Sequence, residues 1–228
     1  GNEAIGLGAA AAGLDAYFAY PMTPSSSLLH FLAARDEDLG IAVVHPESEI
    51  AVANMALGAA FAGARAMVGT SGGGFALMVE AVSLAGMTET PILCLLAQRS
   101  GPSTGVPTYT EQGDLWFALH PGHGEFPRIV LAPGDPKECF ELTRRAFDLA
   151  DRYQTPVIVL SDQYLADSSF TQERFELDGV KPAQCFVRSD AEYKRYHVTE
   201  SGISPRSLPG YGDGVVLVDS DEHTEEGL

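Results

Sequence analysis

Cysteine is scarce in this sequence, and the cysteines that are present lie far apart. Cys94, Cys139 and Cys185 form no Cys-x-x-Cys pair, so this chain alone cannot assemble a zinc site or an iron–sulfur cluster. Isolated cysteines of this kind are typical of reduced, mostly buried thiols in a cytoplasmic protein. We therefore expect a cytoplasmic location and no metal ligands on the chain.

Positively charged side chains are also few. The 228 residues include 14 Lys and Arg against 31 Asp and Glu, which gives a formal net charge of −17. A nucleic-acid-binding surface needs clustered Lys and Arg to neutralise phosphates, and docking on an anionic membrane has the same need. The composition therefore argues against both kinds of partner.

Long apolar runs are missing as well. None approaches the roughly 18 residues of a membrane span, and the N-terminus lacks the basic flank and apolar core of a signal peptide. With 45% hydrophobic residues the chain can still bury a full core, and its length suits one large domain or a domain with part of a second. Because a helical pattern begins within the first residues, we expect the sequence to be a piece of a longer polypeptide.

Short apolar runs alternate with helical patterns along most of the chain. This alternation predicts an α/β fold with a parallel six-stranded sheet flanked by helices over residues 1–170. Residues 171–228 form an irregular extension that we expect to pack on a neighbouring domain or subunit. The expected strands are 15–20, 41–45, 64–70, 91–97, 128–131 and 156–160. The expected helices are 3–12, 26–35, 47–62, 74–84, 113–119 and 135–151.

The loops that follow parallel strands share one edge of the sheet, where ligands bind. The first of these loops, Tyr20-Pro21-Met22-Thr23-Pro24, carries two prolines that fix the backbone on either side of Met22 and Thr23. The Thr23 hydroxyl is therefore presented from a rigid turn. The other segments expected at this edge are 45–49, 70–75, 98–113 and 161–169.

Two acids open a helix that is apolar on all sides. Glu47 and Glu49 precede residues 50–60, which are almost entirely apolar or small, and such a helix is buried. In one interpretation the acids only complement the helix dipole. In the other, a carboxylate in a poorly solvated site shares or accepts a proton. The pattern alone leaves both open.

A glycine-rich turn, Thr70-Ser71-Gly72-Gly73-Gly74-Phe75, joins an expected strand to a helix. Glycines allow a ligand to approach the backbone closely, and the free N–H groups of a helix start attract anions. A tight strand-to-helix turn needs glycine with or without a ligand, so the turn alone does not decide. It lacks the lysine and spacing of a Walker loop and the dinucleotide fingerprint, so nucleoside triphosphate binding is not expected.

Arg99 follows the most apolar expected strand and opens a loop of small hydroxyl residues. A guanidinium in this position is suited to a bidentate grip on a carboxylate or phosphate. The alternative is a structural ion pair with one of the many nearby acids.

Taken together, four of these segments resemble the α subunit of the 2-oxoacid:ferredoxin oxidoreductases. Residues 20–24 resemble the family's Tyr-Pro-Ile-Thr-Pro motif, 47–49 its acidic helix start, 70–75 its Thr-Ser-Gly-Pro-Gly-Phe turn, and 99–108 its Arg-Ser-Gly-Pro-Ser-Thr-Gly-Val-Pro-Thr loop. Residues 1–4 and 219–223 also resemble the family, so the likeness covers nearly the whole chain. Met22 and Gly73 depart from the pattern, where the family has isoleucine and proline.

The resemblance implies the pyrimidine-binding half of a thiamine diphosphate site, on a pyrimidine-binding fold. Glu49 would hydrogen-bond the aminopyrimidine ring and so assist removal of a thiazolium proton, with Glu47 as a flanking acid. Arg99 would pair with the carboxylate of a 2-oxoacid, and Thr23 and Thr108 would also contact this substrate. The remaining implied cofactor contacts are Tyr20, Pro21, Thr70, Ser71, Gly72, Gly73, Gly74 and Phe75.

The resemblance also implies partners and an activity. A β subunit would hold the diphosphate, Mg²⁺ and an iron–sulfur cluster, and coenzyme A would be a co-substrate. The complex would decarboxylate a 2-oxoacid oxidatively to an acyl-CoA and reduce ferredoxin, which would approach through another subunit because this chain is so acidic. Family α subunits commonly continue further, so the chain is expected to be truncated.

Two alternative interpretations remain open. A non-catalytic or regulatory anion-binding module would explain the glycine turn and Arg99, but it gives Glu49 no purpose. A subunit of another thiamine-dependent decarboxylase or ligase would explain Glu49, but the loop 99–108 is typical of the ferredoxin-linked branch.

Overall fold

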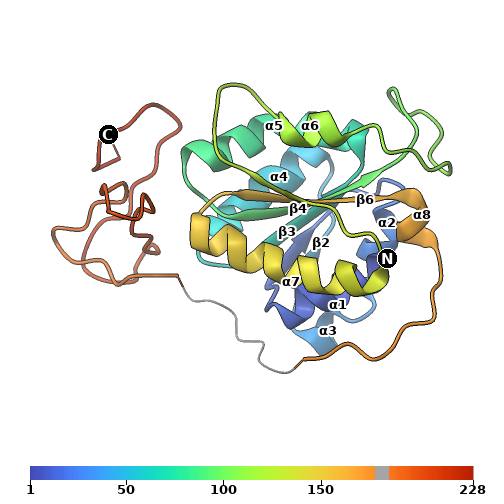
Figure 1. Cartoon of the computed structure of the whole chain (residues 1–228). Helices are drawn as coiled ribbons and strands as arrows, with labels where there is room; N and C mark the ends of the chain where they lie inside the picture. Colours follow the sequence, from blue (N-terminus) through green and yellow to red (C-terminus); the bar gives the residue numbers. More distant parts are fainter. Residues whose placement is uncertain (178–184, 228) are drawn as a thin grey trace.

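A six-stranded sheet forms the centre of the protein. The computed structural model describes residues 1–177 and 185–227 (Figure 1). All strand pairs are parallel, in the order β2-β1-β3-β4-β6-β5, which confirms the predicted α/β class and parallel sheet. The strands are β1 (Ala16–Phe18), β2 (Ala42–Val44), β3 (Ala66–Thr70), β4 (Ile92–Gln98), β5 (Ile129–Leu131) and β6 (Pro156–Asp162).

Helices cover both faces of the sheet, and each face has its own core. Successive side chains of a strand point to opposite faces, so Leu93 and Leu95 of β4 join one core while Cys94 and Leu96 join the other. Within the described residues, no helix is both long and apolar enough to cross a bilayer. The first core lies under α1 (Asn2–Ala11), α2 (Ser26–Ala33) and α7 (Pro136–Tyr153). The second lies under α4 (Glu49–Phe61), α5 (Gly72–Met87) and α6 (Leu115–Leu119).

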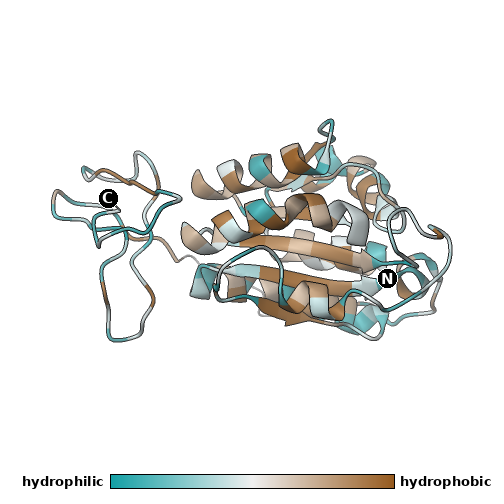
Figure 2. Cartoon of the chain, turned by 90° about the horizontal axis from the view of Figure 1, so that it is seen from above, coloured by the Kyte–Doolittle hydropathy of each residue, from teal (hydrophilic) through white to brown (hydrophobic). Residues whose placement is uncertain are grey.

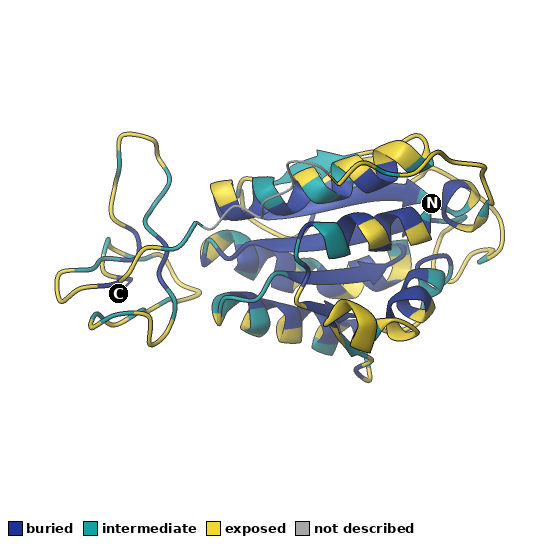
Figure 3. Cartoon of the chain, turned by 90° about the horizontal axis from the view of Figure 1, so that it is seen from below, coloured by how far each residue is buried: buried dark blue, intermediate teal, exposed yellow. Residues whose placement is uncertain are grey.

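The distribution of hydropathy and burial agrees with this three-layer arrangement. Figure 2 shows the strands as mainly hydrophobic ribbons between the helix layers. Figure 3 shows that the inner strands β1, β3, β4 and β6 are almost wholly buried, while the outer sides of the helices are exposed. The edge strands β2 and β5 are only partly buried. Burial on both faces explains why the strands have near-continuous apolar runs instead of alternating patterns.

Three helix starts differ from the sequence prediction by two residues. Ser48 caps α4 by accepting a hydrogen bond from the Ala51 N–H at 3.3 Å, so the helix starts at Glu49 and not at Glu47. The helix α5 starts two residues earlier than expected, at Gly72, and α6 starts two residues later, at Leu115. The predicted cap of α7 is confirmed, since Asp135 accepts from the Glu138 N–H at 2.8 Å.

Two short helices were not expected. The helix α3 (Asp36–Leu39) has an acidic first turn and ends at Gly40, whose φ of 66° favours glycine. The helix α8 (Gln163–Asp167) is capped by Asp162, which accepts from the Leu165 N–H at 2.8 Å. The terminal Gly40 and the capping Asp162 can be seen in the sequence, but each helix is too short to show a helical repeat of apolar residues.

The chain reverses its direction across the sheet between β1 and β3. The helix after β1, α2, lies on the first face, whereas the helices after β2 and β3, α4 and α5, lie on the second. The loops after β1 and β3 therefore diverge to opposite faces and leave a crevice between them, where open parallel sheets bind ligands. This crevice is where the segments singled out in the sequence meet.

The described part of the extension, residues 185–227, contains no helix or strand and docks at the opposite edge of the sheet. Arg195, 3% exposed, donates to the carbonyls of Thr88 and Glu89 at the end of α5. Arg206, 5% exposed, donates to the Ala60 carbonyl near the end of α4. The structure shows that the segment packs on the domain that precedes it; its packing on a neighbouring domain or subunit stays a prediction.

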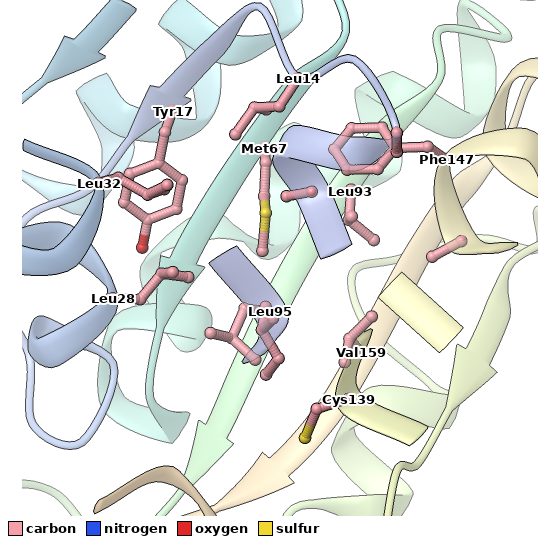
Figure 4. Close-up of a cluster of buried hydrophobic side chains, with 14 of the residues drawn as sticks. Leu14, Tyr17, Leu28, Leu32, Met67, Leu93, Leu95, Cys139, Phe147 and Val159 are labelled. Carbon is pink, nitrogen blue, oxygen red and sulfur yellow. The ribbon is translucent and has the colours of Figure 1, made fainter. Parts of the chain in front are cut away.

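Tyr17 of β1 lies in the first core (Figure 4). It makes a tight contact with Gly69 of β3. A Cβ atom on residue 69 would lie 2.1 Å from the Tyr17 hydroxyl oxygen. This hydroxyl is buried without a hydrogen-bond partner among the described residues, and burial raises the pKa of Tyr17. Glycine at position 69 therefore leaves room for the Tyr17 ring, whose hydroxyl adds no hydrogen bond to the stability of the fold.

We predict that Gly69→Ala destabilises the fold by about 1–3 kcal/mol, because the new methyl group overlaps the Tyr17 hydroxyl. Tyr17→Phe removes a buried polar group without a partner, so it leaves stability unchanged or raises it. In the double variant the cost of Gly69→Ala shrinks. Urea unfolding of the four proteins measures this coupling, and strictly additive effects would contradict the contact.

Candidate active site

A buried carboxylate marks the centre of the site. Glu49 is the first residue of α4 and is only 5% exposed, whereas Glu47 lies before the helix and is exposed. Among the described residues, none hydrogen-bonds the buried Oε1 atom of Glu49. A buried acceptor without a partner is costly, so this atom is suited to a donor supplied by a ligand.

The glycine turn lies directly against this carboxylate. A Cβ atom on Gly74 would lie 2.1 Å from Thr70 Oγ1 and 2.8 Å from Glu49 Oε1. Ser71 is fully buried, and its hydroxyl also lacks a partner among the described residues. The turn thus places the unpartnered, buried oxygens of Glu49 and Ser71 at the start of α5, where the first N–H groups have no carbonyl partner within the helix.

Met22 connects the loop after β1 to the start of α5. Its sulfur accepts a hydrogen bond from the Gly74 N–H at 3.3 Å and lies 3.8 Å from Thr70 Oγ1. Although thioether sulfur is a weak acceptor, this contact joins the loop to the turn across the crevice. The sequence had indicated only a change of shape at this position, because the contact depends on two segments 52 residues apart.

Arg99 lies beside the same loop. Its Nη1 donates to the Thr23 carbonyl at 2.7 Å, so the predicted substrate contacts Arg99 and Thr23 are brought together. A guanidinium has five N–H donors, and this bond uses one. Within residues 1–177 and 185–227 the guanidinium makes no ion pair, so its other N–H groups can meet an anion.

A cavity of about 470 Å³ lies between the glycine turn and the loop after β4. Arg99 and Asp114 are its charged lining residues, and Gly72, Gly73 and Met22 form part of its wall. Burial raises the pKa of Asp114, and the nearby Glu111 raises it further. Sequence reasoning missed Asp114, because nothing in the local pattern places it against a turn some 40 residues earlier.

Gly72, Gly73 and Arg99 are the predicted contacts that line this cavity, and four others are exposed or engaged elsewhere. Thr108 and Pro21 are exposed and do not line it. Tyr20 is 38% exposed, and its ring meets that of His45 edge to face at 5.8 Å. Phe75 is buried against Phe117 in the second core. Roles for these four residues in binding stay predictions.

Two buried amides that the sequence analysis did not single out hold the loops in place. Gln98 donates to the Ser161 carbonyl at 3.2 Å and accepts from the Asp114 N–H at 2.9 Å, so it joins the two ends of the loop 99–113. Asn2 donates to the Pro24 carbonyl at 2.8 Å. The sequence feature that could have indicated this role of Gln98 is its position as a polar residue at the end of the most apolar strand.

Comparison with known proteins gives the family. The sequence profile described as pyruvate flavodoxin/ferredoxin oxidoreductase, thiamine diphosphate-binding, matches residues 7–228. The chain belongs to this family. The match confirms the resemblance inferred from the motifs, and it includes every segment of the crevice.

Relatives of the chain are longer proteins. The α subunit of 2-oxoacid:ferredoxin oxidoreductase 1 from Sulfurisphaera tokodaii is 43% identical over 243 residues, which cover all of this chain and 38% of that protein. The 2-oxoglutarate synthase subunit KorA from Archaeoglobus fulgidus is 45% identical over 216 residues, covering 92% of this chain and 62% of the relative. The chain therefore spans between about two fifths and three fifths of these relatives.

A solved structure has the same fold. The 2-oxoglutarate:ferredoxin oxidoreductase from Magnetococcus marinus, determined with 2-oxoglutarate, coenzyme A and succinyl-CoA bound, superposes with a TM-score of 0.95 at 43% identity. The superposition covers 99% of this chain and 40% of that chain. At this identity the likeness extends to the loops of the crevice as well as to the sheet.

We predict that Gly74→Ala destabilises the protein by at least about 2 kcal/mol, because its methyl group would displace Thr70 and Glu49. Gly73→Ala is the matched control: it meets only the Ser103 carbonyl, at 3.7 Å, and it gains helix propensity. Thermal unfolding separates the two. Equal melting temperatures for both variants would show that the turn is not packed as described.

Proposed function

We propose that the chain is the pyrimidine-binding domain of the α subunit of a 2-oxoacid:ferredoxin oxidoreductase. The observation that carries this proposal is the unpartnered, buried Oε1 atom of Glu49 beside Gly74. A regulatory anion-binding module would have no use for a desolvated carboxylate at this position. The membership of the family and the names of the relatives support the same function.

The residues of the crevice fit an aminopyrimidine. The unpartnered Oε1 atom of Glu49 would share a proton with a nitrogen of the pyrimidine ring. The buried hydroxyl of Ser71 would offer a further hydrogen bond. Met22, Thr70 and Gly74 would keep the two in place and exclude water. Thiamine diphosphate, when bound, supplies the carbon nucleophile that allows decarboxylation of a 2-oxoacid.

The substrate carboxylate would bind at Arg99. The guanidinium is oriented by the Thr23 carbonyl and faces the cavity between the turn and the loop after β4. A planar fork of donors matches a carboxylate better than an ammonium group does. Thr23 and Thr108 would complete the contacts to the 2-oxoacid. Thr108 is exposed, so the substrate or a partner chain would have to move it toward the cavity.

The remaining components would come from other chains. A β subunit would hold the diphosphate, Mg²⁺ and an iron–sulfur cluster, since the three cysteines of this chain lie far apart in sequence. Coenzyme A would accept the acyl group, as the ligands named for the Magnetococcus marinus structure suggest by analogy. The net charge of −17 favours a ferredoxin docking site on another subunit.

Reconstitution tests the function, and Glu49 tests the mechanism. The full-length α subunit is co-expressed with its β partner, and reduction of a dye by pyruvate, 2-oxoglutarate or branched-chain 2-oxoacids is assayed with coenzyme A and thiamine diphosphate. We expect Glu49→Ala to lower kcat at least about 100-fold, as for loss of a proton-transfer group. Glu47→Ala, which removes an exposed acid, is the control. Near-full activity in Glu49→Ala would disprove the proton-transfer role.

Arg99→Ala is expected to raise KM for the 2-oxoacid roughly tenfold to hundredfold, because hydrogen bonds to a charged group are lost. Thiamine diphosphate affinity, followed by cofactor titration, stays close to that of the wild type. Arg99→Lys recovers only part of the loss, since it restores the charge and not the planar fork. Unchanged KM in Arg99→Ala would remove Arg99 from the substrate site.

A further inference from the structure

Asp114 lies at the start of α6, but its side chain serves another element. Its backbone N–H bonds the Gln98 side chain at 2.9 Å, and its carboxyl group makes no capping bond to α6. The carboxyl lies over the first residue of α5 instead. A Cβ atom on Gly72 would lie 2.7 Å from Asp114 Oδ2 and 3.0 Å from Oδ1.

The Asp114 carboxyl has no cation of its own. Its Oδ2 atom is buried without a hydrogen-bond partner, and no ion pair joins it to Arg99 in the described part of the chain. The titratable neighbour on its own loop is another acid, Glu111, which accepts a hydrogen bond from Ser100 Oγ at 2.7 Å. Burial and this acid both raise the pKa of Asp114, so the neutral form is favoured more than for an exposed aspartate.

The surrounding wall of the cavity is built for an anion. Arg99 stands on one side of the cavity, and the first turn of the 16-residue helix α5 stands on the other. The residues of this turn that line the cavity are Gly72 and Gly73, and the hydroxyl of Ser100 adds a polar group to the lining. An anion held here would lie next to the Asp114 carboxyl, and two carboxylates in contact cannot both stay ionised at low cost.

We propose that Asp114 is a second ligand-contacting residue of this cavity, and that its protonated carboxyl donates a hydrogen bond to the carboxylate that Arg99 holds. Binding then takes up one proton from solvent, which ends on Asp114. The identity of the ligand as a 2-oxoacid rests on the proposed function; the role of Asp114 requires only a carboxylate. Affinity is full below the pKa of the free Asp114 carboxyl and falls as pH rises above it, by up to about tenfold per pH unit.

Calorimetry on the assembled enzyme tests this assignment. Oxamate, a non-reacting carboxylate of 2-oxoacid shape, is titrated between pH 5 and 8 in two buffers that differ in ionisation enthalpy. The wild type should take up close to one proton per oxamate near the upper end of this range. Asp114→Asn keeps the shape and a hydrogen-bond donor, so it should bind with no uptake and with an affinity that no longer varies with pH.

Two further variants define the outcome. Glu111→Gln removes the facing negative charge, so the wild-type pH dependence should persist with its midpoint moved to lower pH. Arg99→Ala should weaken oxamate at every pH. Proton uptake that persists in Asp114→Asn, or oxamate binding by the wild type that is absent or without proton uptake, would overturn the proposal. Failure of the proposed function shows separately, as the absence of turnover by an enzyme that still binds oxamate with proton uptake.

Discussion

The site depends on a carboxylate that is buried before it has a partner. Glu49 can remain in this position because Ser48 ends the preceding loop and starts α4, and because Gly74 leaves the carboxylate room against the next helix. A desolvated acceptor weakens a fold, and the cores on both faces of the sheet compensate for it. The constraint explains why residue 74 is glycine, since a Cβ atom there would lie 2.8 Å from Glu49 Oε1.

Specific contacts between distant segments hold the neighbouring loops. Met22, Asn2 and Gln98 each join segments that are distant in sequence, through a sulfur, an amide N–H and an amide oxygen. Each bond closes one loop of the crevice. The polar groups that face the cavity are thereby left free for ligands, while the loops that carry them stay fixed.

Local pattern was sufficient for most of the fold. The six strands, the cap of α7 at Asp135 and the glycine turn at the end of β3 follow from periodicity, capping and glycine content. The predicted start of α4 is two residues too early, because the Ser48 side chain caps the helix. The motifs indicated Glu49 and Arg99 for the site. Asp114 and the sulfur contact of Met22 could not be predicted, because both depend on segments joined only by the tertiary fold.

The anchoring of the extension gives α4 and α5 a property that neither has alone. Arg206 and Arg195 bind carbonyls at the C-terminal ends of these helices, where the helix dipole is negative. The opposite ends carry Glu49 and the glycine turn, and α5 alone spans about 24 Å. The extension therefore holds the C-terminal ends of both helices in place. A change in the position of the extension would therefore act on the same two helices that carry Glu49 and the glycine turn.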